Sequence, residues 1–393
     1  MGRFRTRIKT FLSNLLLAII SVLTTIVVAE LGFRAALFSD IAFMKRYRVP
    51  ERYAYGESDD YWKLDFLFGS SGYKPPKTPH PLLGWVGWFD RETYRHDEYA
   101  RIRNKRPVLL YGDSFASCSV SPKECFHGIL NSDPGFSKNH FLLNYGVGGY
   151  GVSQIFLLYQ KSIGQYKNPF VIVSMLTEDL DRSVLSVRVG QTPFFRIVDN
   201  SLALSGIPIG PSAESFYSKN PPEITSYLFR MFVHSDLFQK FIQSEGPPWR
   251  IKNYFRTKPL QMREQIEQIN RHIILEIIRD LRERNLQFLF LIFHPQWALR
   301  HDDWRDEFLI RLLDSNNVPY LSSKLMLKQH ASQLHTRYED YYLAGGHPNG
   351  YQNRIIANEL KSYLLAASSD THGEVNSSFG SKAAITVASP TNQ

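Results

Sequence analysis

A short apolar run that stops at a serine-bearing turn most constrains the fold of this chain. Residues 108–111 are apolar or aromatic, and Gly112-Asp113-Ser114-Phe115 follows them directly. A continuous apolar run of this length is typical of a strand that is buried on both faces, as in a parallel sheet. At the end of such a strand, a turn places a serine hydroxyl where an open α/β sheet presents a nucleophile. The same tetrapeptide also occurs in ordinary turns, so other segments must decide between the two interpretations.

Other polar or glycine-rich segments stand at the ends of further predicted elements. A strand expected at 141–143 leads into a glycine-rich loop over 144–151, whose backbone amides can face a negative charge without interference from Cβ atoms. A strand expected at 170–176 ends in Thr177-Glu178-Asp179. His347-Pro348-Asn349 comes shortly before 351–365, where apolar residues recur at helical spacing. We therefore expect a serine, a glycine loop and a histidine at junctions of regular structure.

Two more strands complete the predicted sheet. Residues 262–284 carry isoleucine and leucine at helical spacing, and the nearly uninterrupted apolar run 286–293 follows, as expected for a helix and a central parallel strand. His294 ends that strand at the edge where open α/β sheets bind ligands, so it is either a substrate contact or a structural loop histidine. Residues 318–321 predict a fifth strand at the sheet edge, where Pro319 is tolerated.

These segments resemble the SGNH or GDSL hydrolase family over residues 107–365. The resemblance rests on Gly112-Asp113-Ser114-Phe115, on Asn144-x-Gly146-x-x-Gly149 and on His347-Pro348-Asn349. Family members are esterases, lipases and carbohydrate acyl-ester enzymes. The resemblance thus implies a flavodoxin-like three-layer α/β/α sandwich with a parallel five-stranded sheet, and a substrate that is an acyl ester, acetylated glycans being one class. It looks closest to a membrane-anchored branch, to which the segment 178–182 and Pro193-Phe194-Phe195 also correspond.

The family pattern implies roles for three residues and leaves a gap in the oxyanion hole. Ser114 matches the nucleophile, His347 the general base and Gly149 the oxyanion-hole glycine. Where the family has an asparagine that donates to the oxyanion, this chain has Glu178 followed by Asp179, and an ionised carboxylate cannot donate. We expect the hole to use the backbone amides of Ser114 and Gly149, or Asn144 turned inward. Glu178, Asp179 and His294 are then the candidate substrate contacts.

The second departure concerns the carboxylate that orients the histidine. The family places it two or three residues before the histidine, where this chain has Gly345 and Ala344. Asp340 is the nearest replacement, with Glu339 beside it, and a Ser-His dyad oriented by a backbone carbonyl is the other arrangement. Loss of an orienting carboxylate can lower turnover by about 10⁴-fold. A degenerate site that only binds glycan, or serves in polysaccharide assembly, is therefore the alternative to an enzyme.

The N-terminus predicts a membrane-spanning helix. Residues 11–29 contain no charged side chain, and at about 1.5 Å per residue they span roughly 28 Å, close to a hydrocarbon core. Four basic residues precede this stretch, so we expect a cytoplasmic N-terminus and an exported remainder, in the periplasm or outside the cell. A cleaved signal peptide and a buried core helix are the alternatives.

Charge and cysteine content limit the partners. The formal net charge is +9, from 46 basic and 37 acidic residues, and the basic residues outside the N-terminus are dispersed, so no nucleic-acid partner is expected. An attraction to anionic lipid or to an acidic glycan stays open.

Cys118 and Cys125 are either a disulfide or two separate small buried residues. No His and Cys spacing has the pattern of a metal site, and we expect no metal and no cofactor.

Composition shifts divide the chain into four parts. We expect a basic start and membrane anchor over 1–38, an aromatic and proline-bearing stalk or cover over 39–106, a hydrolase-like domain over 107–366 and a disordered tail over 367–393. An insertion of about 183–260 interrupts the domain. It contains a predicted hairpin around Asp199-Asn200 and an apolar helical stripe over 224–241, which is either core or an acyl-chain groove or membrane-facing lid. The oligomeric state is not predicted.

Overall fold

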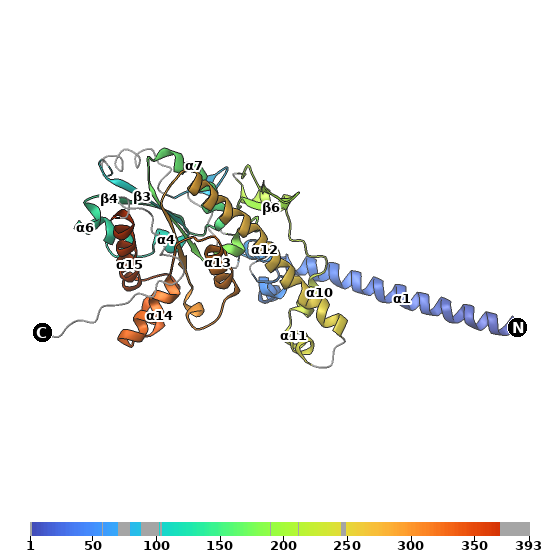
Figure 1. Cartoon of the computed structure of the whole chain (residues 1–393). Coiled ribbons are helices and arrows are strands. Elements are labelled where there is room, and N and C mark those ends of the chain that lie inside the picture. Colours follow the sequence, from blue (N-terminus) through green and yellow to red (C-terminus); the bar gives the residue numbers. More distant parts are fainter. Residues whose placement is uncertain are drawn as a thin grey trace. The chain divides into compact units, whose positions relative to one another are not determined.

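The computed structural model of the chain groups into two compact units, which are described separately (Figure 1). Unit 1 comprises Met1–Pro75, Val187–Val189 and Ser212–Leu260, and unit 2 comprises Pro76–Ser186, Gly190–Pro211 and Gln261–Gln393. The structure describes residues 2–56, 58–69, 79–87, 102, 104–188, 190–210, 212–244 and 249–369. The expected tail beyond residue 369 and parts of the expected stalk, 70–78 and 88–101, lie outside the described residues.

Unit 2 is built on a five-stranded parallel sheet. Its strands are β3 (Arg106–Gly112), β4 (His140–Gly146), β5 (Phe170–Leu176), β8 (Phe288–Phe293) and β9 (Tyr320–Ser322). They lie in the order β4-β3-β5-β8-β9, and every neighbouring pair is parallel. This is the strand order of a flavodoxin-like sheet, and it confirms all five predicted strands.

Alternate residues of each strand face opposite sides, so the sheet carries two hydrophobic cores. Leu109 and Tyr111 of β3 belong to one core, together with α7 (Val152–Ser162), α13 (Trp304–Ser315) and the unit 2 part of α12 (Trp249–Glu283). Val108 and Leu110 belong to the other core, together with α5 (Phe126–Ser132), α6 (Pro134–Ser137), α14 (Ser323–Leu334) and α15 (Gly350–Ser369). Helices therefore cover both faces of the sheet, which confirms the three-layer α/β/α arrangement (Figure 1).

Short elements complete unit 2. A hairpin of β6 (Phe194–Val198) and β7 (Ser201–Ser205) turns at Asp199 and Asn200, as expected, and both turn residues have positive φ. The remaining elements are β1 (Pro79–His80), β2 (Gly84–Trp85), α4 (Ser114–Ser117), η4 (Ile163–Gln165), α8 (Asp179–Arg182), η5 (Gln296–Leu299) and η6 (Tyr338–Tyr341). Helix α15 continues to Ser369, three residues into the segment expected to be a tail.

Unit 1 holds the N-terminal helix and part of the insertion. Its elements are α1 (Gly2–Leu37), η1 (Ala42–Tyr47), η2 (Pro50–Arg52), α2 (Asp59–Phe68), α9 (Ala213–Lys219), α10 (Tyr227–Val233), α11 (Asp236–Gln243) and the start of α12. Over Thr10–Leu37, α1 is long and apolar enough to cross a membrane, although length and composition alone are weak evidence for this. The stripe predicted over 224–241 forms two helices because Ser235 caps α11, accepting a hydrogen bond from the amide of Phe238.

Cys118 and Cys125 form a disulfide, which decides between the two interpretations of these cysteines. Their Cα atoms are 5.9 Å apart, a separation that a disulfide spans without movement of the backbone. The bond closes the loop between α4 and α5, immediately after the turn that carries Ser114.

Candidate active site

Ser114 is the first residue of α4, a single helical turn at the carboxyl end of β3. The strand approaches its neighbour closely here, since a Cβ atom on Gly112 would lie 2.0 Å from the Ser174 hydroxyl on β5. The buried Asp113 caps the turn by accepting a hydrogen bond from the amide of Phe115 at 2.9 Å. The turn is thereby held on both sides, and the Ser114 side chain is left partly exposed at the edge of the sheet.

His347 reaches Ser114 from a loop 233 residues away in the sequence. Its Nε2 lies 3.0 Å from the Ser114 hydroxyl oxygen. The loop before α15 is tight, because the amide of Leu343 donates to the His347 carbonyl at 2.8 Å. The imidazole also packs against Phe115, with ring centroids 5.4 Å apart. Hydroxyl and imidazole are thus within the distance at which a general base takes a proton from a nucleophile.

The other imidazole nitrogen, Nδ1, has no hydrogen-bond partner among the residues that the structure describes, and it is not shut off from solvent. The expected contact with Asp340 is not formed, because the Asp340 carboxylate pairs with Arg337 at 3.0 Å. This guanidinium also holds the pKa of Asp340 below its ordinary value. Glu339 pairs with Arg300 at 2.6 Å. The described site is therefore a Ser-His dyad and not a triad.

The glycine-rich loop brings backbone amides beside Ser114. A Cβ atom on Gly148 would lie 3.9 Å from the Cβ atom of Ser114, and Gly149 has a φ of 83°, a left-handed conformation that favours glycine. The indole Nε1–H of Trp85 donates to the Gly148 carbonyl at 3.0 Å. Because the peptide bond is planar and trans, the Gly149 N–H at its other end points away from Trp85. Across the described chain, neither the Ser114 amide nor the Gly149 amide donates to another group.

Asn144 does not supply an oxyanion donor, contrary to one of our expectations. Its side chain is buried, and the Nδ2 group donates to the Ala116 carbonyl at 2.7 Å and to His127 Nδ1 at 3.0 Å. Burial lowers the pKa of His127 to about 4, so this imidazole is neutral and its Nδ1 accepts. Both amide hydrogens of Asn144 are therefore donated within the protein, and the side chain joins β4 to α4.

Asp179 does not face a substrate either. Its carboxylate is fully buried and accepts hydrogen bonds from the Leu176 amide at 2.9 Å and from Arg182 at 2.5 Å. The same Arg182 guanidinium lies 3.5 Å from the Asp113 carboxylate and donates to the Tyr150 carbonyl at 3.0 Å. Arg182 thus links the end of β5 to the Ser114 turn and to the glycine loop. In this network, the buried carboxylates of Asp113 and Asp179 lie beside one buried guanidinium, so each of the three buried charges has an opposite charge nearby.

His294 is a buried, structural histidine. Of the two roles predicted for it, the structural one is therefore confirmed and the substrate contact is not. Its side chain is fully buried between Asp306, 2.8 Å from Nε2, and Ser323, 3.0 Å from Nδ1. Burial alone would raise the pKa of Asp306, but the hydrogen bond with His294 and the charge of Lys324 hold it below its ordinary value. Because both ring nitrogens are engaged inside the protein, His294 cannot contact a substrate in this structure.

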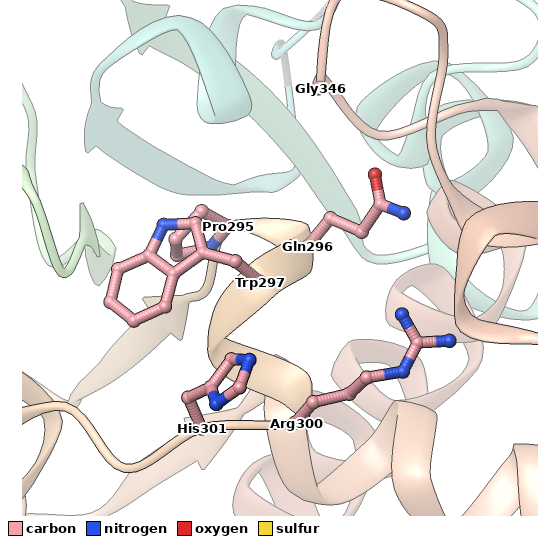
Figure 2. A pocket seen from close by; sticks show the side chains of 6 residues that line it. All are labelled: Pro295, Gln296, Trp297, Arg300, His301 and Gly346. Carbon is pink, nitrogen blue, oxygen red and sulfur yellow. The ribbon is translucent and has the colours of Figure 1, made fainter.

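A hollow of about 400 Å³ lies at the carboxyl end of β8 (Figure 2). Its lining residues are Pro295, Gln296, Trp297, Arg300, His301 and Gly346. Gly346 directly precedes His347, so the rim of the hollow adjoins His347 in the chain. The side chains of Gln296 and Arg300 extend to one side of the hollow and those of Trp297 and His301 to the other (Figure 2). Trp297 is 42% exposed, and its Nε1–H donates to Glu178 at 3.1 Å, which places Glu178 beside the hollow.

Sequence reasoning missed the residues that hold the site together. Trp85 lies in a segment without a motif, and Arg182 was noted only as the last residue of the segment 178–182 that resembles the membrane-anchored branch, without a structural role. Among the described residues no group of three or more His, Cys, Asp or Glu side chains could hold a metal ion.

No family model and no curated protein matches this chain. Among solved structures it is similar to a two-domain esterase active on acetylated mannans, at 11% identity, a TM-score of 0.37 and coverage of 72% of this chain but only 55% of that one. An acetyl xylan esterase matches at 13% identity and a TM-score of 0.37, over 66% of this chain and 99% of the esterase. A member of the lipolytic G-D-S-L family from Veillonella parvula matches at 12% identity and a TM-score of 0.32, over 67% and 98%.

These likenesses are too low for any residue role to be taken from them, so the chemistry must come from this chain's own side chains. Its sheet has the flavodoxin-like strand order, with Ser114 on the turn after β3 and His347 on the loop before α15. The two side chains meet at 3.0 Å. The strand order and the placement of this pair are those that the resemblance to SGNH/GDSL hydrolases implies.

Proposed function

We propose that this protein is a membrane-anchored, exported serine esterase of the SGNH/GDSL type that acts on acyl esters of glycans, acetyl esters first among them. The observation that carries the proposal is the contact of 3.0 Å between His347 Nε2 and the Ser114 hydroxyl. A serine is a weak nucleophile until a neighbouring base accepts its proton, and this geometry provides that base.

In the proposed reaction, the Ser114 oxygen attacks the ester carbonyl carbon while its proton passes to His347 Nε2. A bond forms between the serine oxygen and the acyl carbon, and the carbonyl oxygen becomes an oxyanion that the Ser114 and Gly149 amides stabilise. The tetrahedral intermediate then expels the sugar oxygen, which takes the proton from His347. Water releases the acyl group as an acid, or a second sugar hydroxyl takes it as a new ester; His347 serves as the base in either case.

Two features predict a slow enzyme. The proposed oxyanion hole has backbone donors only and lacks the side-chain amide that the family resemblance implies. Loss of one oxyanion donor typically lowers turnover by about 10²–10³-fold. His347 also lacks a carboxylate on Nδ1, so its orientation depends on Phe115 and on the tight loop. We propose that the catalytic pair is Ser114 and His347, without Asp340.

The hollow beside His347 supports a glycan as the substrate. The exposed indole of Trp297 offers a flat apolar surface to the C–H face of a sugar ring, and Glu178 and Gln296 offer hydrogen-bonding groups around it. We propose Glu178 as a substrate contact on this basis.

The uncharged stretch of α1 supports anchoring. We propose that α1 crosses the inner or plasma membrane once, with the N-terminus in the cytoplasm and the esterase unit in the periplasm or outside the cell. The basic residues before the stretch favour this orientation.

A second candidate is a glycan-binding protein that has lost turnover. The observation that favours it is His347 Nδ1 without a carboxylate, since removal of the corresponding charge in a serine protease lowers turnover by about 10⁴-fold.

Steady-state kinetics on the full-length protein in detergent test the proposal. The substrates are 4-nitrophenyl acetate and an acetylated polysaccharide, and the variants are Ser114→Ala and His347→Ala. We expect wild-type hydrolysis of both substrates, and loss of about 10³-fold or more in kcat for either variant with unchanged circular dichroism. A folded wild type without turnover, whose polysaccharide affinity is unchanged in Ser114→Ala, would establish the binding protein instead.

A further inference from the structure

Helices α10 and α11 expose large apolar side chains that nothing in the described chain covers. Phe229 and Phe232 on α10 are 55% and 51% exposed, and Leu237 and Phe241 on α11 are 76% and 49% exposed. In this subsection α10 and α11 together are called the hairpin, as distinct from the β6–β7 hairpin. We name these four residues the apolar hairpin face. Large apolar side chains gathered on one surface mark a contact with a protein, a ligand or a membrane.

Other apolar residues of the same two helices, next to the exposed ones, are packed. Val233, Phe238 and Ile242 form a small buried cluster that joins α10 to α11. Phe238 also contacts Phe232 and Phe241, with ring centroids 4.9 Å and 6.2 Å apart. The two helices are therefore joined by a small core, and the apolar stripe of each is only partly buried in it, which leaves large apolar side chains for a further contact.

Polar contacts fix where this hairpin begins relative to α1. The Glu30 carboxylate accepts hydrogen bonds from the Ser226 hydroxyl at 2.8 Å and from the amides of Tyr227 and Leu228 at 2.8 Å and 3.0 Å. Arg34 donates to the carbonyls of Ile224 and Thr225, at 2.9 Å and 3.2 Å. The first turn of α10 is thus held against α1 at Glu30, and the two helices pack together (Figure 1).

Glu30 is the first charged residue after the uncharged stretch 11–29. If α1 crosses a membrane, Glu30 lies where the hydrocarbon ends, because a carboxylate is costly inside it. The start of α10 lies at the same level. Since α10 has seven residues, at about 1.5 Å each it carries Phe229 and Phe232 no farther than about 10 Å from that level.

We propose that the apolar hairpin face lies in the interfacial layer of the membrane that α1 crosses, as a second, surface-bound contact with lipid. The inference rests on the proposed anchor and not on the esterase chemistry. Two more exposed apolar residues, Ile41 and Phe43, follow the end of α1 within the same unit. Arg230 and Lys240 on the hairpin supply positive charge for anionic headgroups.

Lipid-quenching fluorescence tests the proposal on the full-length protein in nanodiscs of phosphatidylethanolamine and phosphatidylglycerol. Three variants, Leu237→Cys, Leu334→Cys and Leu23→Cys, each add one free cysteine beside the Cys118–Cys125 disulfide, and that thiol carries an environment-sensitive nitrobenzoxadiazole label. Leu334 is a matched control, because it is a 60% exposed leucine at the end of α14, in unit 2. Leu23 reports on α1 itself. Lipids with a nitroxide near the headgroup or deep in the acyl chain act as quenchers.

We expect the shallow nitroxide to remove at least about half of the emission at position 237, where an interfacial helix lies 5–10 Å deep, and to leave position 334 almost unchanged. The deep nitroxide should quench position 23. Equal, weak quenching at 237 and 334 with a quenched position 23 would overturn the hairpin proposal and leave the anchor standing. A blue-shifted label at 237 that no lipid quenches would show that a protein covers the face. An unquenched position 23 would overturn both anchor and hairpin, while the esterase kinetics test the chemistry separately.

Discussion

A histidine that acts as general base must carry its own proton on Nδ1, and many hydrolases hold that proton against a carboxylate. His347 is held differently. Phe115, the residue after Ser114, packs against its ring, and the His347 carbonyl accepts a hydrogen bond within its tight loop. The imidazole is thus positioned by packing and by backbone geometry, with Nδ1 left to solvent.

Asp340→Asn tests whether the Asp340 carboxylate moves into contact with His347 Nδ1 during catalysis. We expect kcat/KM within about twofold of wild type, because the Asp340 carboxylate is paired with Arg337 at the surface, and exposed pairs of this kind contribute little to stability. His347→Gln is the matched control, since it keeps a polar side chain at the site but cannot act as a base. The measurement is steady-state kinetics with 4-nitrophenyl acetate. A loss of about 100-fold or more in folded Asp340→Asn would mean that Asp340 moves onto His347 in the reacting complex.

Single residues were predictable from sequence where a motif fixes the backbone. Ser114, Gly149 and His347 could be singled out because each stands at a junction of regular structure, in a segment with glycine or proline that resembles a family motif. Their roles stay proposals that kinetics must test. Asp179 was expected to contact the substrate, and a role facing the substrate was one of two alternatives for Asn144 and for His294. The structure supports none of these roles, because burial and hydrogen-bond partners decide where a polar side chain points, and these depend on contacts distant in sequence. His294, for example, meets Asp306 and Ser323 only when β8, α13 and α14 pack together.

At the scale of elements, the glycine loop after β4 depends on a segment far from it in sequence. The β2 residue Trp85 donates its indole N–H to the Gly148 carbonyl and accepts at its own carbonyl from the Tyr150 hydroxyl at 2.5 Å. On the other side, Arg182 donates to the Tyr150 carbonyl. The loop is therefore held from both sides, so its amides need little rearrangement to meet an oxyanion.

Gly149→Ala tests this loop as the oxyanion hole. At a φ of 83° an alanine is strained by roughly 1–2 kcal/mol, so the loop is expected to relax and its amide to turn away from the oxyanion. We expect kcat to fall by about 10²–10³-fold, with a smaller change in KM. Gly164→Ala is the matched control, because a Cβ atom there meets nothing within 4 Å and no positive φ is involved, and its kinetics should equal those of wild type. Equal kinetics for the two variants would remove Gly149 from the oxyanion hole.

The regular elements of unit 2 were the most predictable part of the fold. All five strands follow from continuous apolar runs, and the hairpin follows from Asp199-Asn200, since these patterns depend on local sequence. The break between α10 and α11 was missed, because the apolar stripe continues through it. His234 follows the last residue of α10, and Ser235 caps the start of α11. The disulfide was left open because pairing depends on Cα separation, which sequence does not give.

At the scale of the whole molecule, the chain divides differently from the four consecutive parts expected from composition. The insertion is shared, since its hairpin belongs to unit 2 and its helices α9, α10 and α11 belong to unit 1 with the N-terminal helix. Composition could not reveal this, because it registers polar and apolar stretches and not which distant stretches pack together. The ties of Glu30 and Arg34 to residues near 225 are contacts of that long-range kind.

The proposed chemistry requires Ser114 to be an activated nucleophile in the folded chain. The most direct measurement is intact and peptide mass spectrometry of the full-length protein after treatment with a fluorophosphonate, which bonds covalently to such a serine. We predict one adduct per chain, located on Ser114, absent in Ser114→Ala and formed much more slowly in His347→Ala. A folded wild-type protein that forms no adduct, or forms it on another residue, would contradict the account.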